Sequence, residues 1–208
     1  LSRFELMILT EHYDSRACGS QLKLFLKQAG FAVVTTEHVV IASRRPLERI
    51  SSSDRLLEVR VPDWDLVVLG VYVHPTRSRA QTELLDQILE FAYGQTKSRT
   101  LIAGDFNSCD HADCSKGRSI YNPKKMAKFA EIFVDLWKLG GHPDSTPYTW
   151  WHGETGFRLD HLLASPKLQP SKDTIVVRHD LQTDLSDHAA VIVDGLVNLP
   201  PTPGSAGS

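Results

Sequence analysis

Residues 101–107 read Leu-Ile-Ala-Gly-Asp-Phe-Asn, and the rest of the chain is organised around them. The leading apolar residues predict a short buried strand, and Gly104 lets the backbone turn where it leaves the sheet. Asp105 and Asn107 project to the same side of an extended chain, while Phe106 points into the core. A carboxylate beside a carboxamide can hold an activated water and a phosphate oxygen. An ordinary Asx turn has the same pattern, so the choice depends on the other residues.

Composition sets the broad limits. The chain has 208 residues, 41% hydrophobic and 23% charged, which suits one globular domain. A net charge of -2 argues against a generally basic coat, so a bound polyanion would need local basic patches or a metal ion. No apolar run reaches the length of a membrane span, and we expect a monomer.

The cysteines are Cys18, Cys109 and Cys114, which are too few and of the wrong parity for a disulfide framework. They favour a reducing compartment, and we expect a cytoplasmic protein. Cys109, His111 and Cys114 also have a spacing that could hold zinc. A structural zinc site needs a fourth ligand, however, and no second cluster appears in the sequence, so we do not expect zinc here.

Apolar runs and turn signals predict the other elements. Strands are expected at residues 4–10, 31–36, 39–43, 56–61, 66–73, 100–103, 148–151, 158–164, 174–179 and 189–193. Helices are expected at 21–28, capped by Ser20, at 79–93 after a capping box of Ser78 and Gln81, and from Pro123 through Trp137. The strand, helix and strand between residues 66 and 103 form a crossover unit. The tail, 198–208, is rich in Pro, Gly and Ser and should be disordered.

Further polar side chains lie at the ends of these apolar strands. They are Glu11, Tyr72, Asp160, Asp187 and His188. Each has an ordinary explanation when taken alone, such as a solvated strand terminus for Glu11 or a core aromatic for Tyr72. Asp160 and His161 lie among leucines, so at least one of them must face a partner or a rim.

In this order and with these neighbours, the chain resembles the endonuclease/exonuclease/phosphatase family, which includes exonuclease III-type enzymes, abasic-site endonucleases, deoxyribonuclease I and several lipid phosphodiesterases. The matching segments are LTE at 9–11, VIASR at 40–44, VYVHP at 71–75, GDFN at 104–107, YTWW at 148–151, RLDH at 158–161 and SDH at 186–188. The resemblance implies a four-layer α/β sandwich, with two mixed β-sheets flanked by helices, across residues 1–197. It also implies Mg²⁺-dependent hydrolysis of a phosphodiester at the strand ends.

The resemblance also implies roles for the polar strand ends. Glu11 and Asp187 would bind Mg²⁺ or Mn²⁺, which agrees with hard oxygen ligands and no thiolate cluster. Asp105 would position or deprotonate the attacking water, and Asn107 would hold a non-bridging phosphate oxygen. A second group would act on the phosphate itself: His188, steadied by Asp160, would bind it and stabilise charge, and Tyr72 would assist at the phosphate or the leaving oxygen.

Two departures from the family pattern are visible. Members begin with a strand whose Asn joins the metal site, whereas residues 1–11 match a later strand, so we expect an N-terminal truncation that removes the first strand. Abasic-site enzymes carry an acidic, isoleucine-containing segment after the Asp-Phe-Asn motif and a Trp before Arg-Leu-Asp. Here residues 108–114 read SCDHADC and Phe157 precedes Arg158, which weakens abasic-site specificity.

Three functions therefore stay open. A DNA endonuclease or exonuclease, with a role in DNA repair, is favoured by the basic clusters Arg44-Arg45-Arg49, Arg77-Arg79 and Lys124-Lys125-Lys128. A lipid or small-molecule phosphodiesterase or phosphatase is favoured by the near-neutral net charge. An inactive homologue used as a binding module is favoured by the expected truncation.

Overall fold

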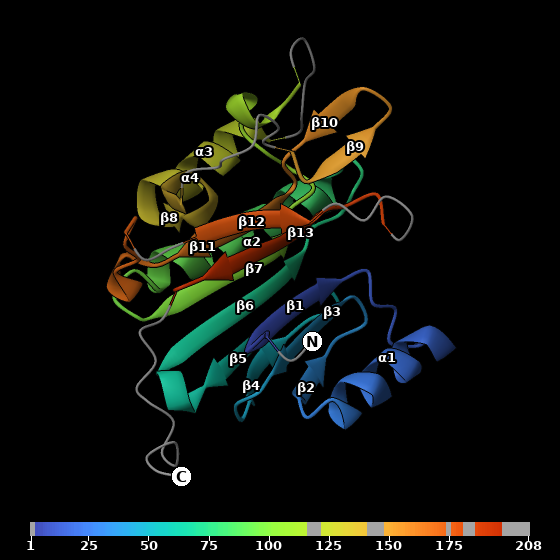
Figure 1. The fold of residues 1–208 in the computed structure, drawn as a ribbon. Helices are drawn as coiled ribbons and strands as arrows, with labels where there is room; N and C mark the ends of the chain where they lie inside the picture. The colour runs from blue at the N-terminus through green and yellow to red at the C-terminus, as the bar shows by residue number, and fades with distance from the viewer. Residues whose placement is uncertain (1–2, 116–121, 141–147, 174–175, 181–185, 197–208) are drawn as a thin grey trace.

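The computed structural model describes residues 3–115, 122–140, 148–173, 176–180 and 186–196. The predicted tail and the proposed domain limit at residue 197 lie outside these ranges. Within them, two β-sheets face each other, with helices on the outer sides (Figure 1). No described helix combines the length and apolar character that a bilayer crossing requires.

The smaller sheet has the order β1-β3-β2, and the described pairings in it are antiparallel. Its strands are β1 (Leu6–Thr10), β2 (Ala32–Thr35) and β3 (Val39–Ser43). The larger sheet has the order β4-β5-β6-β7-β11-β8 and is mixed, because β6 and β7 run parallel. Its strands are β4 (Glu48–Ser52), β5 (Leu56–Val61), β6 (Leu66–Tyr72), β7 (Thr100–Asp105), β8 (Val134–Asp135) and β11 (Asp160–Ala164).

Two hairpins and several helices complete the described chain. The hairpins pair β9 (Trp150–His152) with β10 (Thr155–Phe157), and β12 (Val176–Asp180) with β13 (Ala190–Asp194). The α-helices are α1 (Ala17–Gln28), α2 (Arg79–Gly94), α3 (Pro123–Ile132) and α4 (Leu136–Gly140). Short 3-10 turns cover Pro62–Trp64, His111–Asp113 and Pro166–Leu168.

Strand β3 shows how the sequence produces the layers. All five of its residues are buried. Val39 and Ile41 join the core between the sheets, whereas Val40 and Ala42 join the core under α1. Alternate residues of a strand face opposite sides, so an unbroken apolar run requires cover on both. The strand is therefore an inner layer.

The larger sheet repeats this arrangement. Val68 of β6 packs toward the smaller sheet, while Leu69 packs with Leu85 of α2 and Phe129 of α3. The layers thus run helix, sheet, sheet, helix, and the predicted four-layer α/β sandwich is confirmed. Only the larger sheet is mixed, however, because the described pairings of the smaller sheet are antiparallel.

The predicted helix starts and ends were correct in some places and wrong in others. Ser78 caps α2, and its hydroxyl accepts from the Gln81 backbone N–H at 3.0 Å, as predicted. The Ser20 cap was wrong, because α1 already begins at Ala17 and includes that serine. The long helix predicted through Trp137 was also wrong: α3 ends at Ile132, and the chain extends into β8 before α4.

Candidate active site

Three strand ends bring Tyr72, Asp105 and Asp160 side by side on the larger sheet. Tyr72 is the parallel partner of Asp105, and Asp160 is its antiparallel partner. Residues in register across a sheet project to the same face. Tyr72 belongs to the core between the sheets, so this row faces the smaller sheet. The structure therefore brings together three residues that the sequence singled out.

The Asp105 carboxyl is held by Asn107. The backbone N–H of Asn107 donates to Oδ1 of Asp105 at 2.7 Å, and its side-chain amide donates to Oδ2 at 2.7 Å. The same amide nitrogen also donates to the Val73 carbonyl at 2.9 Å. Asn107 has a left-handed backbone, with φ 45°, which asparagine tolerates better than most residues. The Asx turn is present, and it also fixes the carboxyl of Asp105, a residue that is only 2% exposed.

Gly104 makes this turn compatible with the sheet. Its φ of 139° lies in a region that favours glycine, and a Cβ there would collide with the backbone carbonyl of Val71 on β6. The glycine therefore permits close approach of the two parallel strands immediately before Asp105.

Burial raises the pKa of Asp105 well above its ordinary value, and the neighbouring Asp160 carboxylate adds to the rise. The charge of His188 and the N–H of Asn107 oppose it without reversing it. A carboxyl whose pKa is raised in this way is a stronger base than a solvated one, which suits it to accept a proton.

Asp160 in turn holds His188, since Nδ1 of the ring lies 2.8 Å from Oδ2 of Asp160. Burial alone would lower the pKa of His188. The hydrogen bond to Asp160 and the charges of Asp160, Asp105 and Asp187 outweigh burial and raise the pKa to about 9. The imidazole therefore carries a positive charge at neutral pH.

A second pair joins the two sheets. The Tyr72 hydroxyl donates to Oε1 of Glu11 at 2.6 Å, and Glu11 follows β1 with a left-handed φ of 57°. Burial and the Glu11 carboxylate both raise the pKa of Tyr72, so its hydroxyl stays protonated. The Arg55 guanidinium lies 4.7 Å from the centre of the Tyr72 ring, and the His38 ring centre lies 5.5 Å away.

Asp187, a predicted metal ligand, forms a hydrogen bond with Trp150. Its Oδ2 accepts from the Trp150 indole N–H at 2.8 Å. In the part of the chain that the structure describes, no three His, Cys, Asp or Glu residues gather in a group that could hold a metal ion. The predicted pair of ligands, Glu11 and Asp187, therefore stays a prediction.

The sequence did not single out Thr149 or predict the contacts of Gln81. The Thr149 hydroxyl accepts from the backbone N–H groups of Leu159 and Asp160, both at 3.0 Å. The fully buried Gln81 amide donates to the carbonyls of His74 and Asn107, at 3.0 and 3.3 Å. Gln81 was expected to complete a capping box instead. Thr149 lies in the YTWW segment that matches the family, but that segment does not reveal the bonding partners of Thr149, and the partners of Gln81 are likewise set by the tertiary fold.

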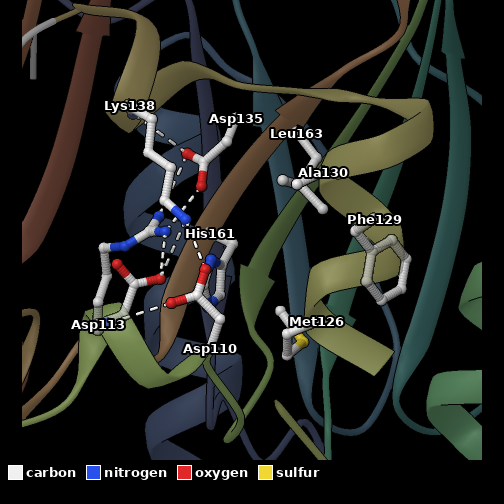
Figure 2. A pocket seen from close by; sticks show the side chains of 10 residues that line it. Asp110, Asp113, Met126, Phe129, Ala130, Asp135, Lys138, His161 and Leu163 are labelled. Atoms are coloured by element: carbon white, nitrogen blue, oxygen red, sulfur yellow. Dashed lines mark hydrogen bonds and ion pairs between the residues drawn. The ribbon is translucent and has the colours of Figure 1, made fainter. Parts of the chain in front are cut away.

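A separate charged cluster lies on the helix-covered side of the larger sheet (Figure 2). Arg158, 1% exposed, contacts Asp113 at 2.6 Å and makes a bidentate contact with Asp135 at 2.7 and 3.2 Å. Lys138 reaches Asp110 at 2.6 Å. His161 is also buried on this side, with Nε2 2.9 Å from the Ser108 carbonyl. Asp160 and His161 thus both have partners, on opposite faces of β11.

The chain forms an α/β sandwich with polar side chains gathered at the ends of its inner strands. The profile of the Endonuclease/Exonuclease/phosphatase family matches residues 5–188, and the chain belongs to this family. Its members are hydrolases of phosphodiester bonds, and they generally use divalent metal ions. No curated protein sequence matches the chain.

Solved structures share the fold. The 3' phosphatase NExo from Neisseria, bound to a product DNA hairpin, has 21% sequence identity and a TM-score of 0.68, with 92% of this chain and 88% of that chain covered. The endonuclease domain of TRAS1, a telomere-specific non-LTR retrotransposon, has 17% identity, a TM-score of 0.65 and coverage of 95% and 88%. Truncated TDP2 of Caenorhabditis elegans has 18% identity, a TM-score of 0.57 and coverage of 90% and 82%.

Proposed function

We propose that this chain is a metal-dependent phosphodiester hydrolase that cleaves DNA. The observation that carries the proposal is the contact between His188 and Asp160, beside the buried Asp105 carboxyl. It combines a charged imidazole, which can bind phosphate, with a carboxyl that can accept a proton. Phosphoryl chemistry needs mainly placement and positive charge, and both are available here.

Asp105 is the proposed base that takes a proton from the attacking water. Asn107 orients it, since both Asp105 oxygens accept from Asn107. The two amide hydrogens of Asn107 are committed to Asp105 and to the Val73 carbonyl. A contact between Asn107 and a non-bridging phosphate oxygen, the role implied by the family resemblance, therefore requires one of these bonds to open.

His188 is the proposed phosphate-binding group, and Asp160 holds its ring. The imidazolium would donate to a non-bridging oxygen and stabilise the charge that develops in the transition state. Tyr72 keeps its proton and would supply a further hydrogen-bond donor at the phosphate or the leaving oxygen.

The donor chemistry of Glu11 and Asp187 fits Mg²⁺ or Mn²⁺. Both offer carboxylate oxygens, and each carboxylate has one oxygen engaged, by Tyr72 and by Trp150 respectively. Mg²⁺ commonly binds through one or two carboxylates together with waters and substrate phosphates. When bound, the metal would supply positive charge to the phosphate.

DNA is favoured as substrate by a family relative of the same fold, NExo, whose structure holds a product DNA hairpin. The basic clusters support DNA less than the sequence suggested. Arg44 donates to the Ala29 carbonyl, Arg79 pairs with Glu83 and Lys125 pairs with Asp86. The runner-up, a lipid or small-molecule phosphodiesterase, is favoured by the net charge of -2.

The test incubates the protein with Mg²⁺ and, in parallel, abasic duplex DNA, plain duplex DNA and sphingomyelin vesicles. Asp105→Asn is the active-site variant, and Asp173→Asn, at an exposed aspartate, is the matched control. We expect cleavage of DNA by the wild type and the control, and a loss of about 10²-fold or more in Asp105→Asn. Turnover of vesicles alone would favour the runner-up, and equal rates in all three proteins would refute the mechanism. An absence of turnover on every substrate would favour the inactive homologue.

A further inference from the structure

We propose that Thr149 is a positioning residue that holds Asp160 and His188 at bonding distance through its side-chain hydroxyl and its backbone carbonyl. The proposal rests on the proposed function, in which this pair binds the phosphate. Asp160 and His188 are 28 residues apart in the sequence, so their contact depends on whatever fixes the two backbones relative to each other.

The hydroxyl of Thr149 fixes the start of β11. Thr149 is fully buried, and Oγ1 accepts from the N–H groups of Leu159 and Asp160, both at 3.0 Å. Asp160 is the first residue of the strand. Because buried N–H groups must find an acceptor, removing the hydroxyl leaves two donors at this point without the partner that they have now. The backbone that carries the Asp160 carboxylate is then free to shift.

The backbone of the same segment fixes His188. The Thr149 carbonyl accepts from the Ala189 N–H at 2.7 Å, directly after His188. Trp150 pairs with His188 in an isolated β-bridge, and its indole holds Asp187 on the other side. The segment Thr149-Trp150 therefore contacts the backbone near Asp160 and the backbone near His188, the two residues whose side chains form the hydrogen bond.

The opposite end of β11 offers a matched control. Ser165 follows the strand, is fully buried, and its hydroxyl accepts from the Thr100 N–H at 3.0 Å. The same hydroxyl donates to the Ser98 carbonyl at 2.6 Å. Ser165→Ala thus removes a buried hydroxyl with two backbone partners, as at Thr149, but at the end of β11 that lies away from Asp160. A purely structural role for Thr149 predicts similar consequences in both variants, whereas positioning predicts a difference.

The experiment compares Thr149→Val, Thr149→Ser and Ser165→Ala with the wild-type chain. Hydrolysis of bis(p-nitrophenyl) phosphate with Mg²⁺ gives kcat and KM, and NMR of the protein without substrate follows the His188 Nδ1–H signal. We expect Thr149→Val to lower kcat by about 10²-fold with little change in KM, because small displacements from near-attack geometry have effects of this size. The variant should also lose the Nδ1–H signal. Thr149→Ser should restore both readouts, and Ser165→Ala should leave both unchanged.

Wild-type kcat and signal in folded Thr149→Val would overturn the proposal, and so would an equal loss in Ser165→Ala. If Thr149→Val does not fold, Thr149→Cys replaces it, because a thiol of similar size is only a weak acceptor. The NMR readout also separates the two proposals. Loss of the signal in Thr149→Val, in a chain that hydrolyses nothing, would support positioning while refuting the proposed function.

Discussion

The two faces of β11 bury carboxyl groups in opposite ways. On the helix-covered face, burial opposes the charge of Asp135. The permanent charge and hydrogen bond of Arg158, together with the nearby His161 and Lys138, outweigh burial and lower the pKa of Asp135. On the face toward the smaller sheet, burial and the neighbouring Asp160 carboxylate raise the pKa of Asp105, in spite of the charge of the titratable His188. A fixed cation makes a buried carboxylate structural, whereas a titratable partner leaves it able to exchange protons.

Within the charged cluster, the pKa of each carboxyl also differs with the number of hydrogen bonds that it accepts from Arg158. Asp135 makes a bidentate contact with Arg158, whereas Asp113 contacts only one of its nitrogens. Burial prevails at Asp113, and its pKa is raised in spite of Arg158. The cluster is therefore anchored mainly by the Arg158–Asp135 pair.

We expect the largest loss of stability when the guanidinium of Arg158 is removed. Arg158→Met should lower the free energy of unfolding by about 3–5 kcal/mol, because Asp135 loses its buried ion pair and Asp113 keeps only the half-exposed Lys138 at 3.7 Å. Urea denaturation measures this change. A loss below about 1 kcal/mol would mean that the cluster does not anchor the fold.

A substitution on the face of β11 toward the smaller sheet should reduce activity more than stability. His188→Gln should lower kcat by about 10²-fold, or about 2.7 kcal/mol of barrier, because the charge at the phosphate is lost. The free energy of unfolding should change far less than in Arg158→Met. If the stability losses of the two variants were equal, the contrast between the faces would fail.

Acid should destabilise the helix-covered face through His161. Burial lowers the pKa of His161 from its ordinary 6.5 to about 3. The unfolded chain therefore takes up a proton near pH 6.5 that the native state refuses until about pH 3. Stability is present above pH 6.5 and falls as the pH drops toward 3, by at most about 1.4 kcal/mol per pH unit. Denaturation midpoints between pH 7 and 4 measure the slope, and His161→Gln should make it shallower.

We expect the smallest loss of stability at Lys138, at the solvent-exposed edge of the charged cluster. The Lys138 side chain is 43% exposed where it pairs with Asp110. Solvent screens such pairs, so Lys138→Met should cost only about 0.2–1 kcal/mol in thermal or urea unfolding. A loss as large as that of Arg158→Met would place the anchor at the rim rather than at the buried guanidinium.

Runs of apolar residues predicted the inner strands well, because a strand that is buried on both faces is apolar at every position, as in β3. Two errors have physical causes. The helical stripe continues through Phe133 and Trp137, but Asp135 is drawn to Arg158 and the chain extends there. Strand β4 was not predicted, because its five exposed residues carry no alternating pattern.

The candidate site was only partly readable from the sequence. Asp105, Asn107, Asp160 and His188 lie in contact, and their roles stay predictions. Thr149 was noticed only as part of the family-matching segment YTWW. Its bonds and those of Gln81 were not predicted, since a hydroxyl or amide pairs with whichever backbone group the fold brings near. Asp187 was assigned to a metal, and its contact with the Trp150 indole likewise depends on where a distant hairpin lies.

The Tyr72–Glu11 hydrogen bond has a mechanical consequence. It joins a strand of the larger sheet to the residue after a strand of the smaller one. Sliding one sheet against the other by a single residue, about 3.3 Å, would break it and separate Glu11 from the rest of the polar row. The position of Glu11 in the candidate site thus depends on how the two sheets of the sandwich pack against each other.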